Sequence, residues 1–399
     1  TITLFVTIEF NDFINESTST SEDYTDPILL VVHKVHEWSK VLQKIQSAFE
    51  KDNKYEVQTT RVATNSLEEW LLSLNKNQME RRLKLLDNAL ATNGIEFCSL
   101  GPSSLSSSSC WTSSNSLCSK IIQCSPQFSC SILVETERDA ELAAKDILHI
   151  SKLEHPQYMK HGLGNFRFCV ASHCSPFIPF FPVAKSDSTR SANTHGIVGF
   201  ALGFENGKLA NKLLSQCLTL QDVQTSFRDG LLNQLIPVDT MCKEIEQTYH
   251  VNYLGMDPSL NPSLEEGGSV ATAIEFLLAT SQVDATGRRH CLGDRGSLAG
   301  AAAVTKALQS FSSTIKVVPG SYCGLMLPVC EDTRLAELAT HRRLTLHTLL
   351  TISSVCGVGI DTVPIPGDCT VEQLKYLILD VVALATRYNK PLTCRVFPV

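Results

Sequence analysis

Short β-type segments alternate with longer amphipathic segments of helical periodicity, and this alternation limits the fold more than any other feature. Apolar side chains recur at helical spacing in Pro27–Lys51 and Gln78–Ala91. Alternating or β-branched segments flank them at Thr1–Phe10, Tyr55–Ala63 and Ile95–Leu100. Strands separated by helices of this length form β-α units with at least partly parallel pairing. The sequence therefore predicts an α/β protein.

The same alternation continues along the rest of the chain. Further strands are predicted at Gln127–Val134, Phe166–Ser172, Gly196–Phe204, Val251–Met256, Leu325–Val329 and Leu392–Val399. Further helices are predicted at Arg138–Ser151, Lys208–Tyr249, Ser269–Ala279, Ala301–Ser310, Glu331–Leu338, Leu344–Val355 and Val371–Arg387. The aromatic and proline-rich segment Pro176–Val183 is predicted to be an irregular loop.

Composition excludes several classes of protein. Hydrophobic residues at 43% and charged residues at 19% are typical of a globular domain. The net charge of −7 comes without any basic tract, so no nucleic-acid partner is expected. Apolar runs such as Leu377–Thr386, which contains Asp380, are too short to span a bilayer, so no membrane partner is expected either.

Fifteen cysteines are scattered without a C-x-x-C pair. Cys110, Cys118, Cys124 and Cys130 fall within the Ser-rich stretch 103–131, but their spacing matches no zinc framework. We interpret this stretch as an exposed loop that leads into a short helix. Buried free thiols in a reducing compartment are favoured over disulfides, which predicts a cytoplasmic protein.

The stretch Val355–Asp368 places an acid where packing alone does not require one. An apolar segment leads to Asp361, which is predicted to lie in a turn built from Pro364, Pro366 and Gly367. A rigidly held, partly buried aspartate is either a structural cap or a functional carboxylate.

A second stretch, Gly255–Pro262, has the same order of residue types and places Asp257 after a predicted strand. The functional interpretation pairs Asp257 with Asp361 as catalytic carboxylates. Such a pair either divides general acid and base roles or binds a divalent cation through oxygen. The alternative is that common turn residues are simply used twice.

Residues Gly293–Gly300 open a helix of small residues. Free backbone amides at Gly293, Gly296 and Ser297, together with Arg295, would bind an anionic group. The glycine pattern fits neither the P-loop nor the dinucleotide fingerprint, and close packing of a small-residue helix explains the same residues. Both interpretations stay open at this point.

Several segments resemble the uncharacterised family "domain of unknown function 711" of archaea and bacteria. They are Gly324–Asp332, Val355–Asp368 and Lys390–Val399, with further matches at Asn165–Val183 and Gly255–Ala273. The resemblance is specific over roughly residues 166–399. It implies a closed α/β barrel of mixed parallel and antiparallel strands, similar to the barrel of pyruvate formate-lyase. The chain is then one large domain, with β-α units in residues 1–151 and the family-typical core in residues 152–399.

No activity or catalytic residue can be transferred from the family. Glycyl radical chemistry is not expected, because no C-terminal glycine loop is visible and Cys323 and Cys356 are expected to be buried structural thiols. We expect an enzyme or binder that acts on a small polar or anionic molecule through Asp257 and Asp361. The alternative is a non-catalytic scaffold or subunit, in a homo-oligomer or a larger assembly. The chain stops on apolar residues, and family sequences continue further, so we also expect a natural C-terminal extension.

Overall fold

The computed structural model describes residues 1–8, 28–70, 76–104, 117–156, 159–160, 162–278 and 290–399. Within these residues one mixed sheet holds nine strands in the order β7-β6-β1-β2-β3-β4-β5-β9-β8. The strands are β1 (Ile2–Val6), β2 (Thr60–Ala63), β3 (Phe97–Ser104), β4 (Phe128–Leu133), β5 (Phe168–Ser172), β6 (Ile197–Gly203), β7 (Tyr253–Asp257), β8 (Gly359–Ile365) and β9 (Leu392–Pro398).

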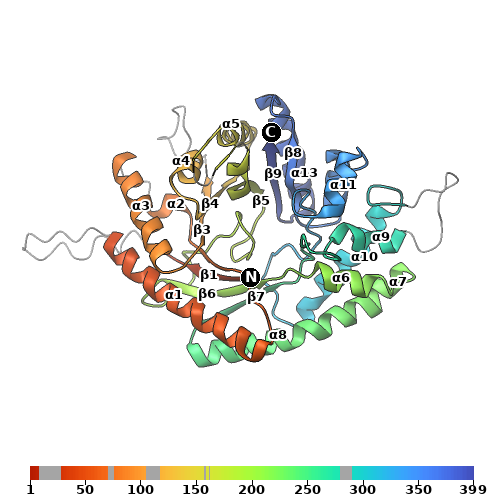
Figure 1. The fold of residues 1–399 in the computed structure, drawn as a ribbon, viewed down its shortest axis with the longest axis horizontal. Coiled ribbons are helices and arrows are strands. Elements are labelled where there is room, and N and C mark those ends of the chain that lie inside the picture. The colour runs from red at the N-terminus through yellow and green to blue at the C-terminus, as the bar shows by residue number, and fades with distance from the viewer. Residues whose placement is uncertain (9–27, 71–75, 105–116, 157–158, 161, 279–289) are drawn as a thin grey trace, which may run out of the picture.

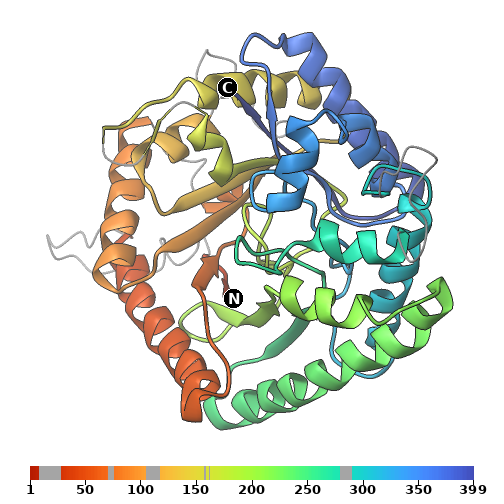
Figure 2. The same ribbon diagram turned by 45° about the vertical axis from the view of Figure 1, so that its right-hand side comes forward.

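Helices surround the strands on the outside of the molecule, as Figures 1 and 2 show. The longer ones are α1 (Ile28–Glu50), α3 (Lys76–Thr92), α5 (Glu137–Ser151), α8 (Arg228–Tyr249), α10 (Ser297–Gln309) and α13 (Val371–Tyr388). The shorter ones are α2 (Leu67–Trp70), α4 (Leu117–Cys124), α6 (Gly207–Leu214), α7 (Leu220–Asp222), α9 (Val270–Leu278), α11 (Thr333–Thr340) and α12 (Leu346–Ser353). Short 3-10 helices cover Lys51–Asn53, Leu163–Arg167 and Ser310–Ser313, and a π-helical turn covers Val223–Phe227.

The strands pair in both directions. β1 to β5 form a parallel block, in agreement with the predicted β-α units. β6 pairs antiparallel with β1, and β9 pairs antiparallel with β5. β7 and β8 then add in parallel to β6 and β9 at the two edges. The predicted α/β class and the predicted mixture of parallel and antiparallel strands are therefore confirmed.

The two faces of the sheet have different partners, because successive side chains of a strand point to opposite faces. Leu4, Val62 and Phe128 belong to the main apolar core, which also contains helical side chains such as Trp38 of α1. On the other face, polar strand side chains reach the loop that was predicted at Pro176–Val183. Thr3 Oγ1, for example, donates a hydrogen bond to the carbonyl of Pro179, 2.9 Å away. The sheet is thus covered by helices outside and by this loop inside.

The segment 316–330 lies between the two edge strands. Single parallel bridges join Met256 to Val317 and Leu260 to Leu325 on the β7 side, and Pro328 to Asp361 on the β8 side. The prediction of a continuous strand at Leu325–Val329 is therefore wrong. Pro328 has no backbone N–H, which interrupts a regular ladder of hydrogen bonds.

Asp361 also differs from its predicted environment. It is the third residue of strand β8 and does not lie in a turn. The register of β8 against β9 shifts between Ile360 and Val363, and Thr362 has a φ of 44°. A bulge of this kind changes the direction of the neighbouring side chain, here that of Asp361. Pro364 is tolerated within β8 because β8 is an edge strand.

Most other predicted elements are confirmed to within a few residues. The short helix predicted for the Ser-rich stretch is α4, which lies within residues 103–131, while residues 105–116 of the predicted exposed loop lie outside the described residues. The cysteines of the described segments are free, and most of them are buried. No helix in these segments is long and apolar enough to cross a membrane.

The close contact of β8 with β9 gives a stability prediction. Gly359 has a φ of +100°, and a Cβ there would lie 2.2 Å from the carbonyl oxygen of Thr393. We expect Gly359→Ala to lower the free energy of unfolding by roughly 3 kcal/mol, because both backbone strain and a backbone clash are introduced. Urea denaturation measures this loss.

Gly267→Ala is the matched control. Gly267 also has a positive φ, +76°, but a Cβ there would meet nothing within 4 Å. This variant should lose only about 1 kcal/mol, the cost of the left-handed conformation alone. Equal losses in the two variants would contradict the predicted clash.

Candidate functional site

A cavity of about 590 Å³ opens on the inner face of the sheet. We call it the inner cavity. Its charged lining residues are Arg61, Arg167, Glu205, Glu331, Asp361 and Arg395. Its aromatic and apolar lining residues include Phe97, Phe166, Phe180, Phe181, Pro182, Val183, Tyr322, Met326 and Val358. Cavities of this size and mixed chemistry are typical of small-molecule sites.

Strand register explains why these residues meet. Arg61 of β2 is paired with Phe97 of β3, so both side chains point to the inner face. Ser131 of β4 is paired with Cys169 of β5 on that same face. The alternate residues of these strands, such as Val62, face the helices instead. The cavity is therefore built from one side of the sheet.

Arg61 is held by aromatic rings. Its guanidinium carbon lies 5.3 Å from the ring centroid of Phe97 and 5.2 Å from that of Phe181. Its Nε donates a hydrogen bond of 3.1 Å to Thr59 Oγ1. Burial, and then repulsion by Arg395, lower its pKa to about 10, so it stays a cation at neutral pH. Within the described segments no carboxylate forms an ion pair with it.

Arg395 of β9 binds two carboxylates. Its Nε lies 2.7 Å from Asp361 Oδ1, and its Nη2 lies 3.2 Å from Glu331 Oε1. Its Nη1 donates to the carbonyl of Phe166. Burial lowers the pKa of Arg395, but the two carboxylates more than offset this, and the pKa ends above its usual value. Arg395 is therefore a fixed cation with its own counter-charges.

Glu331 is the more accessible of the two carboxylates. Its side chain is 43% exposed, compared with 12% for Asp361. Burial raises the pKa of Glu331, although Arg395 acts in the opposite direction. A carboxyl with a raised pKa at the wall of a cavity is suited to exchanging a proton or a hydrogen bond with a bound molecule.

Aromatic side chains form part of the cavity wall. They come from the loop at Pro176–Val183, called the inner loop below, and from Tyr322. Phe180 stacks on Tyr322 with ring centroids 6.2 Å apart. Both belong to a buried apolar cluster with Cys169, Met326 and Val358. These residues give the cavity an apolar surface in addition to its charged groups.

Asp257, the first predicted catalytic carboxylate, has a different environment. It is fully buried at the end of β7 and accepts hydrogen bonds from the backbone amides of Ser259, Tyr322 and Cys323. Ser259 Oγ donates a fourth bond at 2.6 Å. Burial raises the pKa of Asp257, and these hydrogen bonds act against the rise. Asp257 ties a turn after β7 to the loop before Gly324, and it is not among the described residues that line the cavity.

Asp361, the second predicted carboxylate, does line the inner cavity. The structure therefore places the two aspartates in different surroundings, one in a backbone hydrogen-bond cradle and one in an ion pair. In the described ranges there is no group of three or more His, Cys, Asp or Glu side chains that could hold a metal ion.

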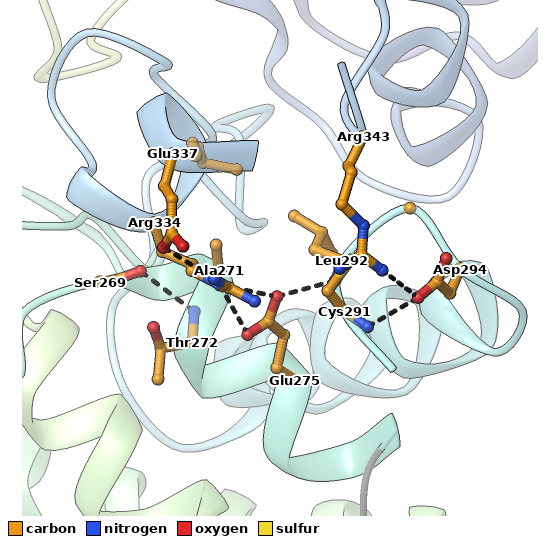
Figure 3. Close-up of polar contacts among 12 residues, drawn as sticks. Ser269, Ala271, Thr272, Glu275, Cys291, Leu292, Asp294, Arg334, Glu337 and Arg343 are labelled. Carbon is orange, nitrogen blue, oxygen red and sulfur yellow. Dashed lines mark hydrogen bonds and ion pairs between the residues drawn. The ribbon is translucent and has the colours of Figure 1, made fainter. Parts of the chain in front are cut away.

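The predicted anion loop lies in a separate polar network, drawn in Figure 3. Gly293 donates its amide to Ser297 Oγ at 2.9 Å, so this amide is already used. Asp294 accepts from the Cys291 amide and from Arg343 Nη2, each at 2.9 Å. Gly296, the N-cap of α10, and Arg295 are both exposed. The described residues of this loop do not line the inner cavity.

The same figure shows a second ion pair close to the loop. Arg334 contacts both oxygens of Glu275 and also Glu337. Glu275 in turn accepts the amide of Leu292. These contacts hold α9, α11 and the loop together, which favours the packing interpretation of the glycines.

The cysteines near the cavity are not activated as nucleophiles. Burial is the main cause that raises the pKa of Cys169, Cys323 and Cys356, the pKa of Cys323 to about 12. Protonated, buried thiols of this kind are structural.

A family model described as "Uncharacterised ACR (DUF711)" matches residues 1–399. The chain belongs to this family. A UPF0210 protein of Pyrobaculum aerophilum is 28% identical over 58% of the chain and 49% of its own length. A UPF0210 protein of Methanopyrus kandleri is 33% identical over 44% of the chain and 35% of its own length. One from Methanocaldococcus jannaschii is 31% identical over 39% and 32%.

The match thus spans about half the length of the Pyrobaculum relative and about a third of the other two. The names of these relatives assign no activity. Membership of the family therefore leaves the function to be argued from the site itself.

Sequence reasoning missed Arg61 and Glu331 and gave Arg395 no role. For the two arginines, the sequence did contain a signal: each is a charged residue inside a β-type segment, Arg61 in Thr60–Ala63 and Arg395 in Leu392–Pro398. An arginine that alternates with apolar neighbours on a strand faces the side opposite to the helices. Its partners come from distant parts of the sequence, so their identity required the fold.

Removal of Arg395 should destabilise the protein. Arg395→Met leaves Asp361 and Glu331 without their cation, and we expect a loss of roughly 3 kcal/mol in the free energy of unfolding near neutral pH. Without Arg395, the folded-state pKa of Glu331 rises further above its unfolded value. The stability of Arg395→Met should therefore fall as the pH rises through that pKa. Its loss of unfolding free energy relative to the wild-type protein should be larger at about pH 8 than at about pH 5.

Urea denaturation at the two pH values measures the effect. Arg387→Met is the control. Arg387 is exposed on α13, where its guanidinium lies over the ring of Tyr388. A loss for Arg395→Met as small as that of the control would contradict the role of Arg395 as a buried counter-charge.

Proposed function

We propose that the inner cavity binds a small anionic molecule with an apolar body. The observation that carries this proposal is Arg61, a cation fixed between two rings without a carboxylate partner in the described segments. An enclosed, unpaired charge is costly, and an anionic ligand group would offset that cost. Guanidinium groups also match carboxylates and phosphates in geometry.

The other arginines of the cavity lining already have partners of their own. Arg395 is already neutralised by Asp361 and Glu331. Arg167 donates to the backbone carbonyls of Phe128 and Ile122. Arg61 therefore has the cationic group best placed to receive a ligand, while Phe180 and Tyr322 offer an apolar surface to the rest of it.

Asp361 keeps the role of a functional carboxylate in this proposal, now together with Glu331. Both lie in the same cavity as Arg61. A molecule bound to Arg61 would have two carboxyls within the same enclosure, an arrangement suited to acid–base chemistry. The protein is then an enzyme or a binder of small anions, and the non-catalytic scaffold is the alternative that an empty cavity would favour.

The architecture that we infer is a closed barrel, as the family resemblance implies. It is supported by hydrogen bonds from the segment 316–330 to both edge strands. Val318 donates to the carbonyl of Met256 on one side, and Val329 donates to the carbonyl of Asp361 on the other. The free, buried cysteines support a reducing, cytoplasmic environment.

Replacement of Arg61 tests the proposal. Isothermal titration calorimetry with phenylpropionate and with inorganic phosphate measures affinity for the two main classes of anion. We expect at least one of them to bind, and Arg61→Met to weaken that binding roughly tenfold or more, because a charge-assisted hydrogen bond is lost.

Arg295→Met is the matched control, since Arg295 is the exposed arginine of the rival anion loop. It should leave the affinity unchanged. If Arg295→Met abolishes binding and Arg61→Met does not, the anion site lies at the loop. If neither anion binds to the wild-type protein, the proposed anion site is contradicted and the non-catalytic scaffold is favoured.

A further inference from the structure

Glu331 lines the inner cavity, and its contacts allow its role in the proposed site to be stated more narrowly. Only its Oε1 has a protein partner in the described part of the chain, the Nη2 of Arg395 at 3.2 Å. The Oε2 accepts no hydrogen bond there, and the side chain is 43% exposed. One carboxylate oxygen is therefore available to a bound molecule.

Asp361 does not have this freedom. Its Oδ1 receives the shorter bond from Arg395 Nε, at 2.7 Å, and its side chain is 12% exposed. The planar guanidinium of Arg395 thus holds Asp361 firmly and Glu331 loosely. Because Arg395 is also anchored on the carbonyl of Phe166, it cannot follow a ligand into the cavity.

The charged groups that act on Glu331 come from four strands or their ends. Arg395 of β9 and Arg61 of β2 favour its ionised form, whereas Asp361 of β8 and Glu205 after β6 oppose it. Burial is the largest influence and raises its pKa. A further negative charge on Arg61 would act in the same direction as burial.

We propose that Glu331 is the specificity-determining residue of the cavity, and that it recognises a hydroxyl or ammonium group on a carboxylate whose anionic end lies on Arg61. The ligand class is then a hydroxy or amino carboxylic acid with an apolar body. This inference rests on the proposed function, because it takes Arg61 as the anion-binding residue.

The two donor groups leave different proton balances. A hydroxy acid adds one negative charge, which raises the pKa of Glu331 further and favours uptake of a proton from solvent on binding. An amino acid is a zwitterion and adds no net charge, so an ionised Glu331 can receive its ammonium group without proton uptake. Calorimetry in two buffers of different ionisation enthalpy counts the protons and separates the two cases.

Three matched probes test the inference: phenylpropionate, phenyllactate and phenylalanine. They share a carboxylate and a phenyl ring and differ in a hydrogen atom, a hydroxyl or an ammonium group. For the wild-type protein we expect phenyllactate or phenylalanine to bind roughly tenfold more tightly than phenylpropionate. In Glu331→Leu, which offers a hydroxyl or ammonium group no acceptor, this preference should fall to about twofold or less, while the affinity for phenylpropionate stays within the same range.

Glu337→Leu is the control, because Glu337 lies on α11 outside the cavity lining and pairs with Arg334. It should keep the wild-type preference. The wild-type comparison of the three probes needs no variant at all.

The outcomes separate the two proposals. If the probes bind in an Arg61-dependent way but with equal affinity, Glu331 does not select the ligand and this inference is overturned, whereas the anion site stands. A preference that survives in Glu331→Leu overturns it as well. If none of the three probes binds, this inference is overturned, and the titration with inorganic phosphate decides whether the anion site stands.

Discussion

Arg395 links three parts of the chain through one planar group. Its ion pairs reach Asp361 on the neighbouring strand and Glu331 after the bridging segment, and its third contact is the carbonyl of Phe166. Arg395 and Asp361 are 13% and 12% exposed, so loss of either partner is costly. The interaction therefore fixes the cavity wall, and it also decides which charges remain for a ligand. With both acids assigned to Arg395, Arg61 keeps its charge for another molecule.

Much of the fold could be predicted from periodicity. The helix expected at Pro27–Lys51 is α1, and the final strand is β9, because long amphipathic runs and alternating apolar runs have clear signals. The exceptions were local. Asp361, predicted to lie in a turn, lies in strand β8 beside a bulge, and the strand predicted around Pro328 forms only isolated bridges. Both depend on hydrogen bonds to segments far away in the sequence.

The site was harder to predict than the fold. The similar stretches around Asp257 and Asp361 suggested a pair of catalytic carboxylates. A shared order of residue types, however, does not give the two side chains the same hydrogen-bond partners. Ser259 and the amides of Tyr322 and Cys323 satisfy Asp257, whereas Asp361 meets an arginine. Arg61 gave no signal beyond a charge in a strand, because the two rings that hold it come from β3 and from the inner loop.

A crystal structure of the protein soaked with para-bromobenzoate tests the central claim most directly, since the anomalous signal of bromine locates the ring without bias. We predict bromine density inside the inner cavity near Phe180 and Tyr322, with the carboxylate on the guanidinium of Arg61. Density only at the surface, or at the loop of Gly293 to Ser297, would contradict the assignment of Arg61 as the anion-binding residue.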